Sequence, residues 1–434
     1  MTDIIEATKP EDQSEKTPQD SLVDRSVLLE RTKGLAEQHS ILDVLHEDLK
    51  RHGYAGPTDI TRLVYLATFS RGLGRPCSLV IKGPSSSGKS FALEAALRYV
   101  VPSAYKYVSG MSEMALVNSA WDLRGTHLVI GEAAGMAQGR GRTFLRQLMS
   151  EGSVTYATVR QTKDGYRGEE VPKVQGPAGV IMTTTAQMLH PEDDTRYLSL
   201  HMDQSPERVR ETLLVQARDE ASSPSNDELG RWHALHEYCF TGVRLAHIPF
   251  LEELAKMLPV GDHRVFRDFQ QVQGLVKSHA LLHQHTRQVY KDRVIATPED
   301  YAQVFELVEP ALSQGLRATV SPHIREIVET VNLCLEEKGN EQGVSQSEVA
   351  QRMARNPSVV SRNVRAAIAM GYIKNLNPSG PGREALLVRG NLDLPSSRVL
   401  PSPDELRIAL QPKKSSKPTF EEFMDSQAKN RHLV

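Results

Sequence analysis

The stretch "IKGPSSSGKSF" (residues 81–91) decides the fold of this chain, because it has the spacing of a phosphate-binding loop. Glycines at the two ends of such a loop let backbone N–H groups turn inward and approach phosphate oxygens. The lysine charge reaches the β- and γ-phosphates, and the hydroxyl that follows it is the usual Mg²⁺ ligand. We therefore expect a site for ATP and Mg²⁺ formed by Gly83, Pro84, Ser85, Ser86, Ser87, Gly88, Lys89 and Ser90, with Ser90 on the metal.

The residues around the loop support this interpretation. "CSLVI" (77–81) predicts a buried strand and "SFALEAALRYV" (90–100) a helix, whose positive N-terminal end would face the phosphates. Two further apolar runs, "THLVIGE" (126–132) and "AGVIMTTT" (178–185), are typical of the centre of a parallel sheet. The sequence therefore predicts an α/β fold with a P-loop nucleoside triphosphatase core.

The composition limits the classes to which the chain can belong. Its 434 residues suffice for two to four domains, and 52 basic against 54 acidic residues leave no global field for nucleic acid or membrane. The scattered Cys77, Cys239 and Cys334 are typical of buried thiols in a reducing compartment, not of a disulfide framework or a zinc site. Because no apolar run approaches roughly eighteen residues and the N-terminus is polar, we expect a cytoplasmic protein without a membrane span.

Hydrolysis needs an acid near the phosphates, and the strand "HLVIGE" (127–132) ends in Glu132. Functional side chains collect where parallel strands end, so we expect Glu132 to act in catalysis and on the metal, with a solvated carboxylate as the alternative. Gly131 stands where an Asp usually precedes this acid, and we expect slow hydrolysis for that reason. The third strand ends in Thr183, Thr184 and Thr185, whose hydroxyls either hold the attacking water or simply suit a strand.

The order of these parts resembles the minichromosome-maintenance branch of the AAA+ ATPases over roughly residues 75–315. "GEAAGMAQGRGRTFLRQLMSEGSVTYATVRQTKDGYRGEEVPKV" (131–174) is similar to that family's acidic strand end, helix and long inserted β-hairpin. "DDTRYLSLHMDQSPERVRETLL" (193–214) resembles its arginine-finger segment. "HRVFRDFQQVQGLVKSHALLHQHTRQVYKDRVIATPEDYAQVFELVE" (263–309) resembles its helical lid.

This resemblance implies roles for three residues. Arg196 takes the place of the arginine finger, Arg267 that of the lid arginine at the nucleotide, and Thr185 that of the catalytic third-strand sensor, which is usually Asn. Exposed, solvated arginines are the alternative for the first two. The resemblance also implies a homo-oligomeric, hexameric ring that acts on DNA as a helicase or translocase. Replication of a mobile element or an accessory replication system would suit it, with a primase among its partners. The alternative is an ATP-switched DNA-binding regulator or loader that does not translocate.

The region from residue 264 to 285 follows a helical pattern. Phe269 and Val272 lie on a predicted core face that leaves Arg267 free to reach a phosphate. Three histidines later in this region invite a metal interpretation, but they have no acidic partner at ligand spacing. We therefore expect a solvated helix face that carries His279, His283 and His285.

Residues 343–390 carry a second signal. Ser345 and Glu348 have the spacing of a capping box, and a second helix follows with Val360 and Val364 on its core face. "YIKNLNPSGPGREALLVRG" (372–390) predicts two strands, which completes a winged helix-turn-helix pattern. Seven basic residues against two acids suit contacts with phosphates, and protein docking is the alternative. The expected DNA-binding residues here are Ser358, Ser361, Arg362, Arg365, Lys374 and Arg383.

The predicted hairpin in the ATPase core has a basic tip. Asp164 and Gly165 tolerate the left-handed geometry of a turn, and Lys163 lies beside them. We expect Lys163, with Arg160 and Arg167, to grip DNA in the channel of a ring. The alternative is a solvated surface hairpin.

These patterns divide the chain into six parts. We expect a disordered tail (1–21), a helical segment (22–75), an ATPase core (76–220) with its hairpin at 153–174, a helical lid (228–318), a winged-helix domain (319–390) and a flexible tail (391–434).

Overall fold

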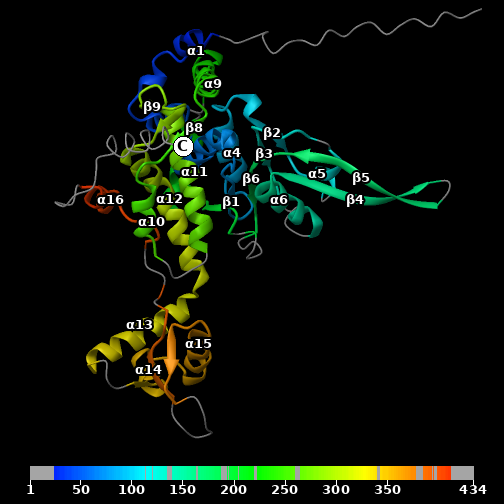
Figure 1. Ribbon diagram of the computed structural model, residues 1–434. Helices are drawn as coiled ribbons and strands as arrows, with labels where there is room; N and C mark the ends of the chain where they lie inside the picture. Colours follow the sequence, from blue (N-terminus) through cyan, green and yellow to red (C-terminus); the bar gives the residue numbers. More distant parts are fainter. Residues whose placement is uncertain are drawn as a thin grey trace, which may run out of the picture.

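The computed structural model in Figure 1 covers the predicted core, lid and C-terminal unit. The described residues are 24–112, 114–119, 121–133, 139–162, 165–186, 193, 195–203, 205–218, 222–259, 264–339, 343–377, 385–392, 394 and 398–411. The expected N-terminal tail lies outside this part of the chain. Among the described residues, no helix is long and apolar enough to cross a membrane.

A five-stranded parallel sheet forms the centre of the molecule. Its strands are β1 (Leu79–Lys82), β2 (Tyr105–Val108), β3 (His127–Ile130), β6 (Gly179–Thr184) and β7 (Leu198–His201), in the order β2-β3-β6-β1-β7. The three predicted strands are the three central ones, and they are buried along their whole length. Continuous apolar runs form such strands because helices cover both faces of the sheet. The expected α/β fold with a P-loop core is confirmed.

Alternate residues of the strands point into two separate cores. Leu79 and Ile81 face the N-terminal helices and the lid. Val80 faces α5 (Ala115–Asn118), α6 (Gly139–Glu151) and the base of the hairpin. The hairpin itself consists of β4 (Ser153–Thr162) and β5 (Gly165–Gln175), and it projects from the body in Figure 1. Val154 is buried and Tyr156 half-buried at its base, on the face of β4 that packs toward the body.

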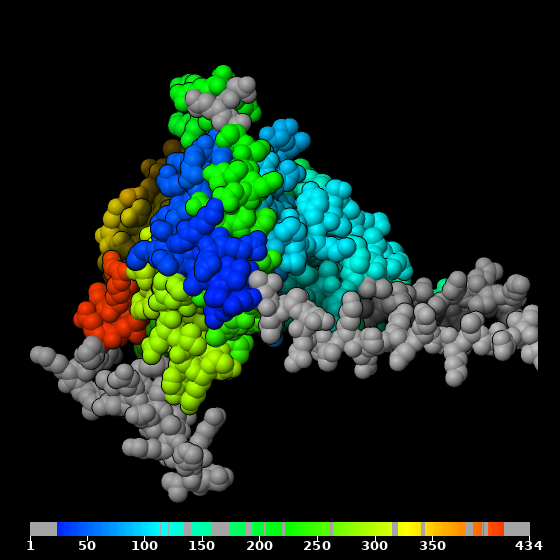
Figure 2. Space-filling view, turned by 90° about the horizontal axis from the view of Figure 1, so that it is seen from above, coloured from blue at the N-terminus to red at the C-terminus, as the bar shows by residue number. Residues whose placement is uncertain are grey.

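The N-terminal segment is helical, as expected. It contains α1 (Arg25–Arg31), α2 (Ile41–Arg51) and α3 (Thr58–Thr68), with short 3-10 turns at Leu35–Glu37 and Phe69–Gly72. Helix α3 packs against α4 (Lys89–Leu97), and α1 packs against α9 (Asn226–Thr241). The blue N-terminal helices therefore lie against green residues in Figure 2.

The remaining helices before residue 320 form the lid region. They are α8 (Pro206–Arg218), α9, α10 (Leu251–Lys256), α11 (Arg264–Leu282) and α12 (Pro298–Thr319). A small sheet of β8 (Leu245–His247), β10 (Arg293–Ile295) and β9 (Val289–Tyr290) joins them. Val272 is buried and Phe269 packs against the same core, as predicted. All three cysteines are free thiols, and all three are buried, as we expected.

The histidine prediction is wrong for two of the three residues. His279 and His283 are buried, and only His285 is exposed. The Nδ1 atom of His279 lies 2.7 Å from a carboxylate oxygen of Asp300. The rings of His279 and His283 are in contact, with centroids 4.5 Å apart and planes tilted by 31°. Burial lowers the pKa of His283 well below its usual value of 6.5. Among the described residues, no cluster of three or more His, Cys, Asp or Glu side chains could hold a metal.

The C-terminal unit has a core of its own. It consists of α13 (Pro322–Glu337), β11 (Val344–Ser345), α14 (Gln346–Arg352), α15 (Pro357–Ala369), β12 (Ile373–Asn375) and β13 (Leu386–Arg389). Its strands form an antiparallel sheet in the order β11-β13-β12. The predicted capping box of Ser345 and Glu348 is present, and Val360 and Val364 are buried.

The chain returns from the C-terminal unit to the lid. Residues 398–411, which we call the strap, include α16 (Pro403–Ala409) and lie beside α12 in Figure 1. The backbone N–H groups of Val399 and Leu400 each donate to the buried carboxylate of Glu309, at 2.8 Å. The Tyr301 hydroxyl donates to the carbonyl of Pro401 at 2.6 Å. This packing differs from the flexible tail that we expected from residue 391 onward.

Candidate nucleotide-binding site

The phosphate-binding loop connects β1 to α4 at the carboxyl edge of the sheet. Lys89 is buried, and its ammonium donates to the carbonyl of Pro84 at 2.7 Å. The buried hydroxyl of Ser87 has no hydrogen-bond partner among the described residues. A Cβ atom on Gly83 would lie 2.7 Å from that hydroxyl, and Gly88 has φ +85°. The loop therefore needs glycine at both ends.

These features fit a triphosphate. The buried Ser87 hydroxyl has no partner among the described residues, and the Lys89 ammonium donates to a neutral carbonyl, so both groups can donate to phosphate oxygens. The N-terminus of α4 follows directly and adds backbone N–H donors. Ser90 is exposed at the start of that helix, where its hydroxyl can reach Mg²⁺.

The predicted acid and the third-strand threonines lie at the same edge. The Glu132 side chain is exposed, and its backbone N–H donates to the Ser109 carbonyl at 2.9 Å. Thr183 is buried and donates to the Gly131 carbonyl, and the Thr184 hydroxyl accepts from Ala186 N–H. Thr185 is therefore the exposed member of the three. Strand β6 lies between β1 and β3, so all these groups meet where the three strands end.

The structure gives a steric reason for Gly131. A Cβ atom at this position would lie 2.6 Å from the hydroxyl of Tyr107 and 3.1 Å from the carbonyl of Ser109, both at the end of β2. An Asp side chain at position 131 would require both neighbours to move. Glycine at position 131, where an Asp usually precedes the catalytic acid, thus accompanies the close approach of β2 to this residue.

Sequence reasoning missed one wall of the site. A cavity of about 620 Å³ lies beside the phosphate loop, between residues 53–57 and α8. The rings of Tyr54 and Phe91 stack there with centroids 5.5 Å apart. Arg208 donates to the carbonyls of Ala55 and Gly56 at 3.1 and 3.3 Å. The signal in the sequence was the aromatic, glycine-containing "GYAGP" (53–57), but only the fold brings it to the phosphate loop.

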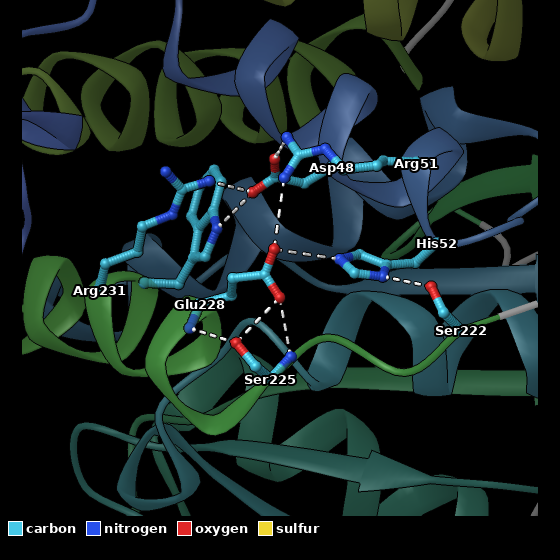
Figure 3. Close-up of polar contacts among 8 residues, drawn as sticks. Asp48, Arg51, His52, Ser222, Ser225, Glu228 and Arg231 are labelled. Carbon is cyan, nitrogen blue, oxygen red and sulfur yellow. Dashed lines mark hydrogen bonds and ion pairs between the residues drawn. The ribbon is translucent and has the colours of Figure 1, made fainter.

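A polar network fixes this wall to the lid region (Figure 3). Asp48, at the end of α2, is buried and contacts the guanidinium groups of Arg51 and Arg231, and it accepts from the Trp232 indole at 3.0 Å. The neighbouring Glu228 caps the first turn of α9. The network holds the chain just before residue 53, and its labelled members are Asp48, Arg51, His52, Ser222, Ser225, Glu228 and Arg231.

Arg196 and Arg267 lie together in a second cavity, of about 360 Å³. Arg267 donates to the hydroxyl of Thr195, and the carbonyl of Arg196 accepts from Gln271 at 3.1 Å. Arg196 precedes β7, whose first residue pairs with Leu79 at the amino end of β1. The phosphate loop follows the opposite end of β1. The structure therefore joins the two predicted arginines but does not bring Arg267 to the phosphate loop of the same chain.

The basic excess of the C-terminal unit is smaller than the sequence suggested. Arg352 pairs with Glu337 at 2.6 Å, Arg355 with Glu326 at 3.0 Å and Arg389 with Glu336 at 2.5 Å. All three acids belong to α13, which precedes residues 343–390. The neutralised arginines leave a narrower basic surface on α15 and β12.

That surface contains most of the DNA-binding residues that we predicted. Arg362 and Arg365 are exposed on one face of α15, one turn apart, and Lys374 is exposed on β12. Ser358 is exposed and Ser361 half-buried on the same helix. Arg383 lies outside the described residues. In the hairpin, Lys163 also lies outside them, and Arg160 pairs with Arg167 across the β4–β5 ladder.

No family model matches the sequence, and no curated protein matches it. Among solved structures, the chain is similar to a full-length MCM homolog from Methanopyrus kandleri, with 16% sequence identity and a TM-score of 0.40. The match covers 65% of this chain and 60% of that chain. It is also similar to the Aeropyrum pernix ORC1 protein in complex with DNA (13% identity, 81% and 91% covered, TM-score 0.25). A third similar structure is the C-terminal region of NrS-1 in an apo form (10% identity, 83% and 75% covered, TM-score 0.26). The chain thus spans less than two thirds of the MCM homolog, and at these identities the likeness concerns the fold alone.

Proposed function

We propose that this chain is an AAA+ ATPase that assembles into a ring, most simply a hexamer, and couples ATP turnover to movement on DNA as a helicase or translocase. One observation carries the proposal. The phosphate loop and Glu132 lie at the carboxyl edge of the sheet, whereas Arg196 and Arg267 share a cavity at its amino edge. In a head-to-tail ring, one subunit's amino edge faces the next subunit's phosphate loop, so each site is completed by a second copy.

The chain's own residues have separate tasks in this proposal. Lys89 and the loop N–H groups would hold the phosphates of ATP. Ser90 and Glu132 would hold Mg²⁺, which would supply positive charge to the phosphates when bound. Glu132 also orients water, with Thr185 beside it as the sensor. Arg196 stabilises transition-state charge across the subunit boundary.

Two surfaces would contact DNA. We infer that the C-terminal unit is a winged helix that contacts the phosphate backbone through Arg362, Arg365 and Lys374. These three cations are exposed. The neighbouring arginines Arg352 on α14 and Arg389 on β13 are instead paired with acids of α13. The hairpin tip, with Lys163 between Arg160 and Arg167, would line the channel of the ring. Other replication proteins, such as a primase, remain candidate partners in this proposal.

One observation favours the alternative, an ATP-switched regulator or loader that does not translocate. Tyr107 and Ser109 close the space in which an acid at position 131 would sit, so Mg²⁺ has one carboxylate fewer at this strand end. Slow hydrolysis suits a switch better than a motor.

Measurement of ATP hydrolysis and strand displacement with and without DNA tests the proposal. We expect DNA to stimulate hydrolysis and the protein to displace an annealed strand. Lys163→Ala should keep basal hydrolysis and DNA binding but lose displacement, whereas the surface variant Lys50→Ala should behave like the wild type. DNA-stimulated hydrolysis without displacement of a strand or of a bound protein would contradict the translocase and favour the switch.

A further inference from the structure

The segment that carries Arg196 is attached to α6 along a single stripe of that helix. Asp193 is buried, and its two carboxylate oxygens lie 3.1 Å from Nε of Arg142 and 3.2 Å from Nε of Arg146. The guanidinium of Arg196 contacts the hydroxyl of Ser150. Positions 142, 146 and 150 are successive turns of one helix face, since residues four apart in a helix lie above one another.

Asp193 and Arg196 also belong to one turn. The backbone N–H of Arg196 donates to the carbonyl of Asp193 at 2.8 Å. Arg196 is therefore attached to α6 through its backbone and through its side chain. Its turn begins at Asp193, which contacts Arg142 and Arg146, and its guanidinium contacts Ser150 in the last turn of α6. Because Asp193 is buried, loss of one of these ion pairs would leave its charge less compensated, which is costly.

Helix α6 lies in the chain between Glu132 and the β4–β5 hairpin. It begins at residue 139, shortly after Glu132, and ends at Glu151, two residues before the hairpin strand β4 begins. Its opposite face, with Phe144, Leu145 and Leu148, is buried against the sheet. Helix α6 is therefore attached both to the hairpin and to the turn that carries Arg196.

We propose that Asp193 is a positioning residue that couples a subunit's own hydrolysis site and hairpin to the arginine that it offers to its neighbour. The inference rests on the proposed role of Arg196 in trans. Asp193 touches neither nucleotide nor DNA; it transmits the position of α6 to Arg196 through Arg142 and Arg146. Its loss should leave nucleotide binding intact and impair the neighbouring site.

Asp193→Asn tests this assignment, with Asp193→Glu as the conservative rescue. Misplacement of a catalytic group by about 1 Å can cost about a hundred-fold in rate, so we expect kcat to fall ten- to a hundred-fold with little change in the Kd for a fluorescent ATP analogue. Backbone hydrogen exchange of residues 195–198 should accelerate in the nucleotide-free protein. The matched control Asp122→Asn breaks an exposed aspartate–arginine pair and should change none of these quantities.

Mixed rings separate positioning from a general structural defect. Asp193→Asn subunits mixed with Lys89→Ala subunits should regain activity, because the two defects lie on opposite sides of a subunit interface. The same subunits mixed with Arg196→Ala subunits should stay inactive, because both defects lie on the same side. The milder variants Arg142→Gln and Arg146→Gln, each removing one arm of the bridge, should show the same pattern if Asp193→Asn does not fold.

The outcomes distinguish the inference from the function on which it rests. If Arg196→Ala abolishes turnover but Asp193→Asn and both arginine variants do not, the positioning role is overturned and the ring ATPase stands. The role is also overturned if the Asp193→Asn defect is restored by Arg196→Ala subunits, or if the milder variants lose nucleotide binding. If Arg196→Ala itself leaves turnover unchanged, the proposed function fails first.

Discussion

The backbone N–H of Gly83 donates a hydrogen bond to the carbonyl of Thr184, 3.3 Å away. The first glycine of the phosphate loop is thereby fixed to the last residue of the neighbouring strand. Thr185, the residue that we expect to be the sensor, follows directly, so only backbone atoms separate it from the phosphate loop. This link depends on the parallel pairing of β1 with β6, in which Lys82 faces Thr184.

Two substitutions in the nucleotide site should affect ATP binding and ATP turnover separately. Lys89→Ala removes the charge that meets the phosphates, and we expect no measurable binding of a fluorescent ATP analogue. Glu132→Gln keeps the shape of the side chain but cannot act as a base, so binding should persist while kcat falls at least about a hundred-fold. Lys50→Ala, an exposed lysine on α2, is the control. Full turnover by the Glu132 variant would show that another group activates the water.

The exposed arginines of α15 should account for DNA affinity. Arg362→Ala with Arg365→Ala should weaken binding and reduce the salt slope of log K by about two, because about two fewer counterions are released. The matched control, Arg352→Ala with Arg389→Ala, removes the same formal charge from arginines paired with Glu337 and Glu336. Titration of labelled duplex at several salt concentrations measures both. Equal effects of the two double variants would contradict the surface that we propose.

The strap should be held mainly by the carboxylate of Glu309. Replacement by Gln removes the charged acceptor of two backbone N–H groups. A hydrogen bond to a charged group contributes about 1.5–3 kcal/mol to the free energy of unfolding. We expect faster hydrogen exchange at Val399 and Leu400 and a lower urea midpoint. Glu299→Gln, on the same helix, breaks only an exposed pair with Arg407 and should change stability by less than about 1 kcal/mol. A strap of unchanged protection in the Glu309 variant would mean that apolar contacts alone hold it.

Buried histidines should make the fold sensitive to acid. Burial lowers the pKa of His127 from 6.5 to about 4, and it lowers that of His236 well below 6.5. The unfolded chain binds these protons first as pH falls, so stability present above pH 6.5 is lost progressively toward pH 4, by about 3 kcal/mol for His127. Urea midpoints at several pH values measure the loss. His236→Leu, which removes a ring whose nitrogens are both unpartnered among the described residues, should flatten the slope, and an unchanged slope would refute this account.

The local features of this protein follow from its sequence. The phosphate loop, the three central strands, the Ser345–Glu348 capping box and the core face of α15 each depend on residues a few positions apart. Hydrophobic periodicity and side-chain capping predict such elements from residues that are close together in the sequence. The α/β class follows as well, because continuous apolar strands that alternate with helices can be buried only inside a parallel sheet.

The completion of the sites depends on contacts between distant residues, which only the tertiary structure decides. Arg208 reaches Ala55 across 153 positions, and Glu309 reaches Val399 across 90. His279 of α11 and His283, which follows the helix, are buried because Asp300 and the packing of α12 cover a face that the local pattern left polar. The arginines of the C-terminal unit are neutralised by a helix that precedes it. Charge and polarity are properties of single residues, whereas burial and pairing are properties of the surfaces that folding brings into contact.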